Sequence, residues 1–549
     1  MSGKGTLLAT ASTFEPLRNR LFLAYWLTAL VANFGWLIQV VGASWLMTSI
    51  EGSPEQVALV QTSLALPVML FSLLAGAAAD NFGRQRVVMV AQAFLLVISI
   101  ALAVFSYFGW MTPWILLGFT FLVGTGKAMS NPGWQTMVNE FMPREQLPAA
   151  IALNSVGFNM ARSVGPMVGG IIVGAAGAFA AFLINALSNV GMLLVLFRWK
   201  GEERAQTLPR ESLGSAMMAG IRYVAMSPHI LLVMLRGGIF NFAAISITAL
   251  LPLTARDLLG GGPQTYGLLL GAFGIGAIAG AMGSARLRTL FSFEGLTRLG
   301  FVGFGGGVLL VVVNVHVALS VVGVALCGAS WLLTLSGLTA NVQMSSPRWV
   351  VSRCHALFQT ACFGGNALGS FVWGVLAANI GLAGSLALSA LALLLGALVG
   401  LRFPLQELDM LAVDPHGTSW TGPDIALDVL PRSGPILTMV EYVIAQENEP
   451  AFLAAMAERR RVRIRNGARR WGLARDMVRP QCWIEHYQTP TWVETERLHE
   501  RRTKADADLA DLIRGLHQGP ERPAIRYCLD RQAGWFRPDD PNMPGDINP

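Results

Sequence analysis

The feature that most constrains this chain is a series of long apolar segments that recur between residues 21 and 403. A helix needs about 20 apolar residues to cross the hydrocarbon core of a bilayer, where no water is present to bind its backbone groups. We therefore predict an all-α membrane protein with twelve transmembrane helices. Their predicted ranges are 21–47, 56–79, 87–108, 114–138, 149–175, 178–197, 230–254, 265–285, 296–315, 318–341, 354–379 and 383–403.

Basic residues gather in every second loop between these segments. Arg84 and Arg86 follow the second segment, for example, and Arg402 ends the twelfth. Arg256, beside Asp257, is the only basic residue that we place in the alternate loops. Because Lys and Arg favour the cytoplasmic side, both termini are predicted to be cytoplasmic. The net charge of +7 is then explained by basic loops that contact membrane lipids. No nucleic-acid partner is expected.

The composition changes after Leu405 and indicates separate domains. Residues up to Leu405 include 21 Lys and Arg and 11 Asp and Glu, whereas the remainder includes 19 Lys and Arg and 22 Asp and Glu.

Two six-helix halves suit a transporter whose small-molecule substrate binds between them. We predict helices in 1–197, a cytoplasmic central loop at 198–229 with a surface helix at 211–226, helices in 230–405, a linker at 406–435, a soluble domain at 436–531 and a disordered tail at 532–549.

Charged residues inside the predicted helices point to function. Lys127, Arg162 and Arg236 lie within the segments, and none of the segment cores contains Asp or Glu. Charges in hydrocarbon are costly and mark substrate or ion pathways. The cations lack an evident partner, so an anionic substrate is predicted to supply one; the alternative is that each cation snorkels to the interface. Polar neighbours predicted to bind substrate with them are Asn33, Gln39, Asn154, Asn159 and Asn241.

A short motif follows the second segment with the spacing G-x-x-x-D-x-x-G-R-x-R, formed by Gly76, Asp80, Gly83, Arg84 and Arg86. The first glycine permits close helix contact, the second allows a turn with positive φ, and the arginines can bind lipid headgroups. The motif resembles the loop 2–3 signature of the major facilitator superfamily, although Asn81 and Gln85 replace residues that are usually basic there. The resemblance implies a gating or structural role for these residues.

The fifth segment carries a second motif, with Gly165, Pro166, Gly169 and Gly170. The proline kinks the helix, and the glycines offer a smooth face to a partner helix. The motif resembles the fifth-helix signature of superfamily exporters that exchange substrate for protons. With no carboxylate in the segment cores, protons would have to use Glu140, Asp80 or the substrate itself.

The wider membrane part is similar to the bacterial branch of the superfamily that includes the enterobactin exporter. The likeness is carried by the stretches from Asn131 to Asn159 and from Phe363 to Gly374. It implies export of a small anionic metabolite such as a siderophore across the bacterial inner membrane. A multidrug efflux pump for amphipathic compounds is the alternative, which the missing intramembrane carboxylate disfavours for cationic drugs.

The sequence of the soluble domain predicts the element order β-α-β-β-α-β of a ferredoxin-like fold. Strands are expected at 436–444, 468–477, 481–488 and 523–529, and helices at 448–462 and, with an interruption, 491–515. The run from Trp483 to Tyr487 resembles dimeric domains related to antibiotic-biosynthesis monooxygenases. The resemblance implies that Glu485, Tyr487 and His499 face one cavity, in a small oxidase or a ligand sensor. The alternative, which we favour, is a homodimerisation module with no enzymatic activity, and no cofactor or metal site is expected.

Overall fold

The structure is a computed structural model that describes residues 15–530, apart from 51, 83, 143–145, 200–212, 314–315, 348, 406–421, 424 and 428. Its residues divide into two compact units. The described parts of 1–209, 233–339 and 358–406 form the first unit, which holds most of the residues of the long helices. The second unit is formed by the described parts of 210–232, 340–357 and 407–549.

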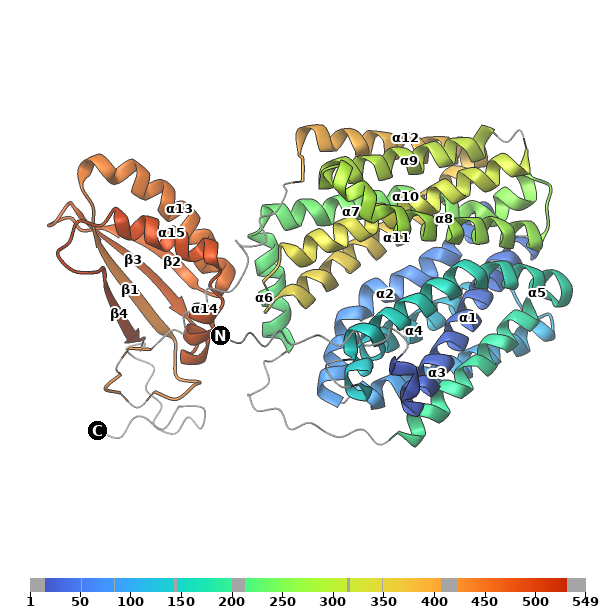
Figure 1. The fold of residues 1–549 in the computed structure, drawn as a ribbon, viewed down its shortest axis with the longest axis horizontal. Coiled ribbons are helices and arrows are strands. Elements are labelled where there is room, and N and C mark those ends of the chain that lie inside the picture. The colour runs from blue at the N-terminus through green and yellow to red at the C-terminus, as the bar shows by residue number, and fades with distance from the viewer. Residues whose placement is uncertain are drawn as a thin grey trace, which may run out of the picture. The chain divides into compact units, whose positions relative to one another are not determined.

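The long helices before the central loop match the predicted first half (Figure 1). Its fifth and sixth predicted segments lie in one helical stretch, which breaks at Gly177, where φ is +73°. Only glycine adopts this left-handed conformation readily, so a single residue joins the two helical arms. The helices are α1 (Arg20–Ser49), α2 (Pro54–Phe82), α3 (Arg84–Tyr107), α4 (Pro113–Phe141) and α5 (Leu147–Arg198), preceded by a 3-10 turn at Glu15–Arg18.

The second group of long helices follows a short helix, α6 (Leu213–Ala225), at the position of the predicted surface helix. Each long helix coincides with one predicted segment of the second half. They are α7 (Pro228–Leu253), which runs into a π-type turn at Thr254–Leu258, then α8 (Pro263–Leu290), α9 (Phe293–Val313), α10 (Val317–Met344), α11 (Val351–Ile380) and α12 (Leu382–Arg402).

Within the described part of the chain, nine helices are long and apolar enough to cross a membrane. The long stretch of α5 is one of these nine, although it covers two predicted segments. The helices α2 and α4 are not among the nine, but they lie where the second and fourth segments were predicted. The membrane-spanning architecture is therefore present, and the count of twelve stays a prediction.

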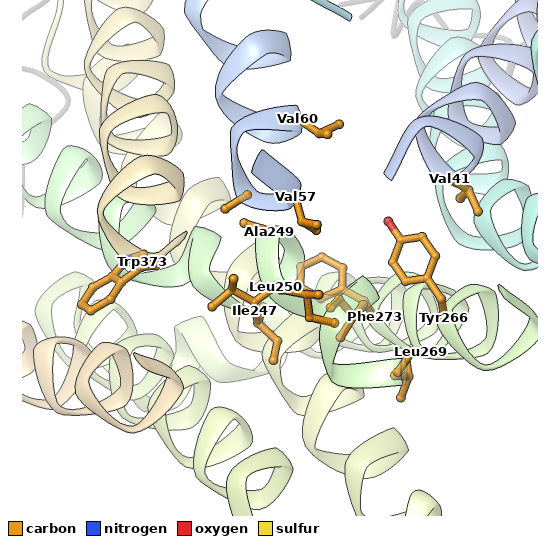
Figure 2. Close-up of a cluster of buried hydrophobic side chains, with 14 of the residues drawn as sticks. Val41, Val57, Val60, Ile247, Ala249, Leu250, Tyr266, Leu269, Phe273 and Trp373 are labelled. Carbon is orange, nitrogen blue, oxygen red and sulfur yellow. The ribbon is translucent and has the colours of Figure 1, made fainter. Parts of the chain in front are cut away.

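One apolar cluster connects the two groups of long helices, and Figure 2 shows part of it. Val41 on α1 and Val57 on α2 belong to the same cluster as Leu250 on α7 and Phe273 on α8. These residues come from the end of α1, the start of α2 and the corresponding parts of α7 and α8. The two halves thus share a packed core near the α1–α2 and α7–α8 connections.

The C-terminal domain is a four-stranded antiparallel sheet with helices (Figure 1). The strands are β1 (Ile436–Val443), β2 (Arg469–Arg475), β3 (Cys482–Thr489) and β4 (Ala524–Leu529), in the order β2-β3-β1-β4. The helices are α13 (Glu449–Asn466), α14 (Trp492–Glu500) and α15 (Lys504–Gly515), after a 3-10 turn at Gln446–Asn448. The predicted sequence of strands and helices is confirmed, with the second helix divided in two.

Local chemistry explains this division and the packing of the sheet. The Thr503 side chain accepts from the Asp506 backbone, and Asp506 accepts in return from the Thr503 backbone. This capping box starts a new helix at α15. Alternate residues of β1 are buried, and Val440 and Tyr442 pack with Phe452 and Met456 of α13. The helices therefore cover one face of the sheet.

Candidate functional site

A cavity of about 830 Å³ lies in the first unit, lined by helices of both halves. This volume is within the range of small-molecule sites. On α5 the lining residues Asn154, Phe158, Arg162 and Pro166 recur every four positions, which places them on one face of the helix. Six of the eight residues predicted to bind substrate line the cavity: Asn33, Lys127, Asn154, Asn159, Arg162 and Asn241.

Two cations define the electrostatics of this cavity. Among its described lining residues, Lys127 on α4 and Arg162 on α5 carry the only charges. Lys127 Nζ lies 5.2 Å from the ring centroid of Trp36, and Arg162 Cζ lies 3.9 Å from that of Trp331. Cation–π contact offsets part of the cost of leaving water. In the described part of the chain neither cation has an ion pair, so the cavity keeps a positive excess.

Sequence reasoning missed several residues that line this cavity. The indoles of Trp36 on α1 and Trp331 on α10 were not assigned a role, although they contact the cations. Trp36 follows Asn33 by three positions, and this helical spacing was the available signal. Trp331 belongs to the other half, and no sequence spacing links it to Arg162. Further polar lining residues that were missed are Gln61, Gln92, Gln359 and Asn366.

The loop 2–3 motif is described only in part. The side chains of Gly76, Asp80, Gly83 and Arg84 lie outside the described residues, as does Glu140, and Arg86 is exposed. Gln85, which replaces a basic residue of the signature, donates to the carbonyls of Leu196 at 2.8 Å and Trp199 at 2.6 Å. These carbonyls belong to the end of α5, where the helix leaves acceptors unsatisfied. Gln85 therefore ties α3 to the C-terminal end of α5.

The fifth-helix motif packs closely against two neighbours. A Cβ on Gly165 or Gly169 would lie 3.1–3.2 Å from atoms of α1. A Cβ on Gly170 would lie 2.7 Å from the Cα of Gly267 on α8 and 2.7 Å from the carbonyl oxygen of Pro263. Pro166 is buried and lines the cavity. The motif thus brings backbone against backbone between α5 of one half and α8 of the other.

A model of one protein family, described as transmembrane secretion effector, matches residues 11–533. The chain belongs to the transmembrane secretion effector family of the major facilitator superfamily. This assignment makes it a multi-pass membrane protein, in agreement with its apolar helices. The matched range continues beyond the membrane part, so the C-terminal domain is included in the family's pattern.

Curated relatives and solved structures agree with this family assignment. Multidrug efflux pump Tap of Mycobacterium tuberculosis (strain H37Rv) is 28% identical over 219 residues, 38% of this chain and 51% of the pump, so the chain spans about half the length of that relative. Tap of Mycolicibacterium fortuitum is 26% identical over 399 residues, 70% of this chain and 95% of that protein. The staphyloferrin A transporter of Staphylococcus aureus is 22% identical over 250 residues, 44% and 61% respectively. A variant of nucleoside transporter NupG shares the fold, with a TM-score of 0.59 and 11% identity over 70% of this chain and 100% of that chain.

Gln39 was predicted to bind substrate, but the structure places it outside the cavity lining. It accepts hydrogen bonds from Asn185 and from Ser99, the latter at 3.3 Å, and Asn185 also donates to Ser99 at 2.9 Å. All three side chains are buried and belong to α1, α3 and α5. Within this family member Gln39 therefore satisfies a buried polar network that joins three helices.

Arg236 also lies outside the cavity lining, and the expectation that it lacks a partner was wrong. Helix α9 begins at Phe293, three residues before the predicted segment, and this brings Glu294 into its first turn. Arg236 Nη1 donates to Glu294 Oε2 at 2.5 Å, with side-chain exposures of 2% and 12%. The same carboxylate oxygen accepts from the Leu405 backbone at 3.0 Å. Arg236 thus joins α7 to α9 as one member of a buried ion pair.

In the C-terminal domain, the three predicted cavity residues are all buried. Glu485 accepts from Arg463 Nε at 3.0 Å and from Tyr442 Oη at 3.0 Å, and the Arg463 guanidinium lies 4.3 Å from the Tyr487 ring centroid. His499 shares a contact of 3.5 Å with the Tyr527 hydroxyl. Burial opposes ionisation of Glu485, but the arginines outweigh it and hold its pKa at about 2. Glu485 and Tyr487 therefore share Arg463, while His499 meets a different partner.

Proposed function

We propose that this chain is a secondary transporter that exports a small organic anion, such as a siderophore, from the bacterial cytoplasm. The observation that carries the proposal is the pair of cations, Lys127 and Arg162, in a cavity whose described lining contains no Asp or Glu. A cation in hydrocarbon is stabilised by a negative partner. An anionic substrate bound between them would supply that charge, while the surrounding amides would orient it.

The transport cycle that we propose follows from the two halves. Substrate would bind between them near the bilayer midplane, and the halves would rock about it. In the structure the halves pack together near the α1–α2 and α7–α8 connections. With twelve spans and both termini in the cytoplasm, this packed end would face the outside. Export would then require α5 and α8 to separate where Gly170 now meets Gly267.

Proton antiport is the proposed driving force, and it follows from the fifth-helix motif. Asp80 and Glu140 remain the proposed proton carriers, since the described lining of the cavity offers no carboxylate. Membrane lipids, protons and the substrate are the proposed partners. A homodimer through the C-terminal domain, without enzymatic activity, completes the proposal. A working oxidase or a ligand sensor is the alternative for that domain.

A multidrug efflux pump for amphipathic compounds is the second candidate function. The name of the Tap pumps and the aromatic lining of the cavity support it. Aromatic rings bind flat apolar molecules without demanding one shape. The rings in the described lining belong to Trp26, Trp36, Phe158, Tyr266, Phe273, Phe304, Trp331 and Phe363.

Everted membrane vesicles separate the two candidates, because export appears there as uptake. We would impose a pH gradient and compare the uptake of a catecholate siderophore with that of a cationic dye. Gradient-dependent uptake of the siderophore, absent from vesicles without the protein, is the expected result. Uptake of the dye alone would reject anion export and leave the drug pump.

A further inference from the structure

The C-terminal domain contains a cluster of buried and half-buried arginines that the transport proposal does not use. Arg459 and Arg463 lie one turn apart on α13 and are 7% and 4% exposed. Arg502 follows α14 and interacts electrostatically with both of them. One carboxylate, that of Glu485 on β3, forms ion pairs with Arg459 and Arg463. Buried cations normally each have an anionic partner. Here the arginines outnumber the carboxylate beside them.

Both oxygens of the single carboxylate already accept hydrogen bonds. Its Oε1 atom accepts from Arg463 Nε at 3.0 Å and from Trp471 Nε1 at 3.1 Å, and its Oε2 atom accepts from the Tyr442 hydroxyl. Arg459 Nε is 3.7 Å from the same Oε1, beyond hydrogen-bond distance, and has no hydrogen-bond partner in the described part of the chain. The same part of the chain contains no ion pair of Arg502. The cluster therefore contains a buried donor, Arg459 Nε, without an acceptor in the described part of the chain.

Neighbouring titratable groups do not neutralise this excess. Burial, followed by repulsion from Arg463 and Arg459, lowers the pKa of Arg502 to about 10, so it remains charged at neutral pH. Burial, followed by repulsion from Arg502, lowers the pKa of His499 to about 3, so its ring is neutral. Burial also raises the pKa of Tyr442, which keeps that hydroxyl protonated. Three positive charges thus face one negative charge.

Aromatic rings lie beside one of these arginines and beside the neighbouring His499. Tyr487 stacks on Arg463 with 4.3 Å between its ring centroid and Cζ, and the Tyr527 hydroxyl lies 3.5 Å from His499 Nε2. Trp492 meets Tyr527 edge to face, with 6.0 Å between ring centroids. Guanidinium groups bind carboxylates through paired hydrogen bonds, and flat rings pack against flat rings. Both features favour a ligand that combines a carboxylate with an aromatic ring.

We propose that Arg459, Arg463 and Arg502, with Tyr487, His499 and Tyr527, form a binding site for a small aromatic carboxylate. The site belongs to the C-terminal domain and adds a ligand-sensing role to the proposed transporter. Within the same compact unit, Arg501 lies 4.4 Å over the ring of Trp349, at the junction between α10 and α11. Ligand bound at Arg502 would therefore be one residue from a contact with that junction.

The test measures equilibrium binding of salicylate to the full-length protein in lipid nanodiscs. Lys127→Gln and Arg162→Gln are present in every sample, so that the membrane cavity does not contribute and failure of the transport proposal is scored separately. We expect saturable binding. Its affinity should fall about tenfold or more with Arg459→Gln or Arg502→Gln, since each substitution removes a charged hydrogen bond to the ligand. The matched control is Arg461→Gln on the exposed side of α13, which should bind as the parent does.

Two further arms make the result decisive. Neutral benzamide should not compete, because it has the ring without the charge. Arg502→Lys keeps the charge without the planar fork and should therefore weaken binding less than Arg502→Gln. The Lys variant also gives a result if the Gln variant folds poorly. Unchanged binding in folded Arg459→Gln and Arg502→Gln samples, or equal competition by benzamide, would overturn the proposal.

Discussion

Cations occur in two settings within the helices of the membrane part, and they differ in what surrounds them. Arg236 pairs with Glu294 between α7 and α9, outside the cavity lining. Lys127 and Arg162 lie in the cavity against indole rings and have no ion pair in the described part of the chain. The first setting is complete without a ligand, whereas the second lacks an anion. The difference teaches that a charge inside a helix points to a ligand site only where the protein does not itself supply the partner.

The largest expected effect comes from breaking the completed pair. Arg236→Met should leave Glu294 buried without its cation and cost about 3–5 kcal/mol. Thermal unfolding of the protein purified in detergent should therefore show a much lower Tm, or no folded protein. The double variant Arg236→Met with Glu294→Leu should recover most of the loss, because both charges are gone. If the single variant were as stable as the parent, the pair would not hold α7 to α9.

The next largest effect concerns the contact between the halves. Gly170→Leu should abolish transport, because its side chain would meet the backbone of Gly267 and Pro263. Uptake in everted vesicles measures this loss. We expect uptake to fall at least about fivefold, which corresponds to the cost of about 1–3 kcal/mol for one overpacked side chain. Gly118→Leu on α4 is the control, since a Cβ there meets no atom within 4 Å. Normal uptake by Gly170→Leu would show that α5 and α8 can transport without this close approach.

The cavity cations should respond in the opposite way to Arg236, because replacing one of them removes a charge that has no ion pair in the described part of the chain. Lys127→Met should keep or raise the Tm by a few degrees. It replaces a half-buried charge that has no ion pair in the described part of the chain with an apolar side chain, which should stabilise the protein by about 0.5–2 kcal/mol. The same variant should lose anion uptake. Thermal unfolding and vesicle uptake are measured on one preparation. A large fall in Tm would mean that Lys127 already has a structural partner, and the contrast with Arg236 would disappear.

The last expected effect lies in the C-terminal domain and depends on pH. Folding keeps His499 neutral, whereas the unfolded chain takes up a proton below the ordinary pKa of 6.5. The unfolded state therefore binds more protons between pH 6.5 and about 3, and stability falls on acidification. From pH 7 to pH 5 the loss should be about 2 kcal/mol.

Opening of this domain in the full-length protein can be measured by alkylation of the Cys482 thiol, which is buried in the folded domain. Mass spectrometry gives the extent of alkylation. Rates are compared with those of the denatured chain at each pH. His499→Gln should remove the extra opening at pH 5, whereas His486→Gln should retain it. The same pH dependence in both variants would assign the effect to another group.

Much of the fold could be predicted from the sequence because lipid imposes a strict length and polarity on each helix. The first strand of the C-terminal domain was predicted from alternation, which one buried face requires. The break at Gly177 was placed within two residues, although its left-handed backbone was not foreseen. Such features depend on a few local residues.

The candidate site was harder to predict because it depends on contacts between distant helices. Six polar and charged lining residues were found, since polarity inside an apolar segment is visible in sequence. Gln39 was wrongly included, because its partners lie on α3 and α5. Arg236 was wrongly left without a partner, because a shift of three residues at the start of α9 decided whether Glu294 was buried.

Reversing one charge tests the central claim most directly. Everted vesicles with Lys127→Glu are compared with vesicles of the unchanged protein for the ratio of catecholate siderophore uptake to cationic dye uptake. If the cavity selects anions through its unpaired cations, the ratio should fall by about tenfold or more, as for the loss of one charged hydrogen bond. A ratio that stays the same in a folded variant would contradict the claim that Lys127 provides the charge to which the substrate binds.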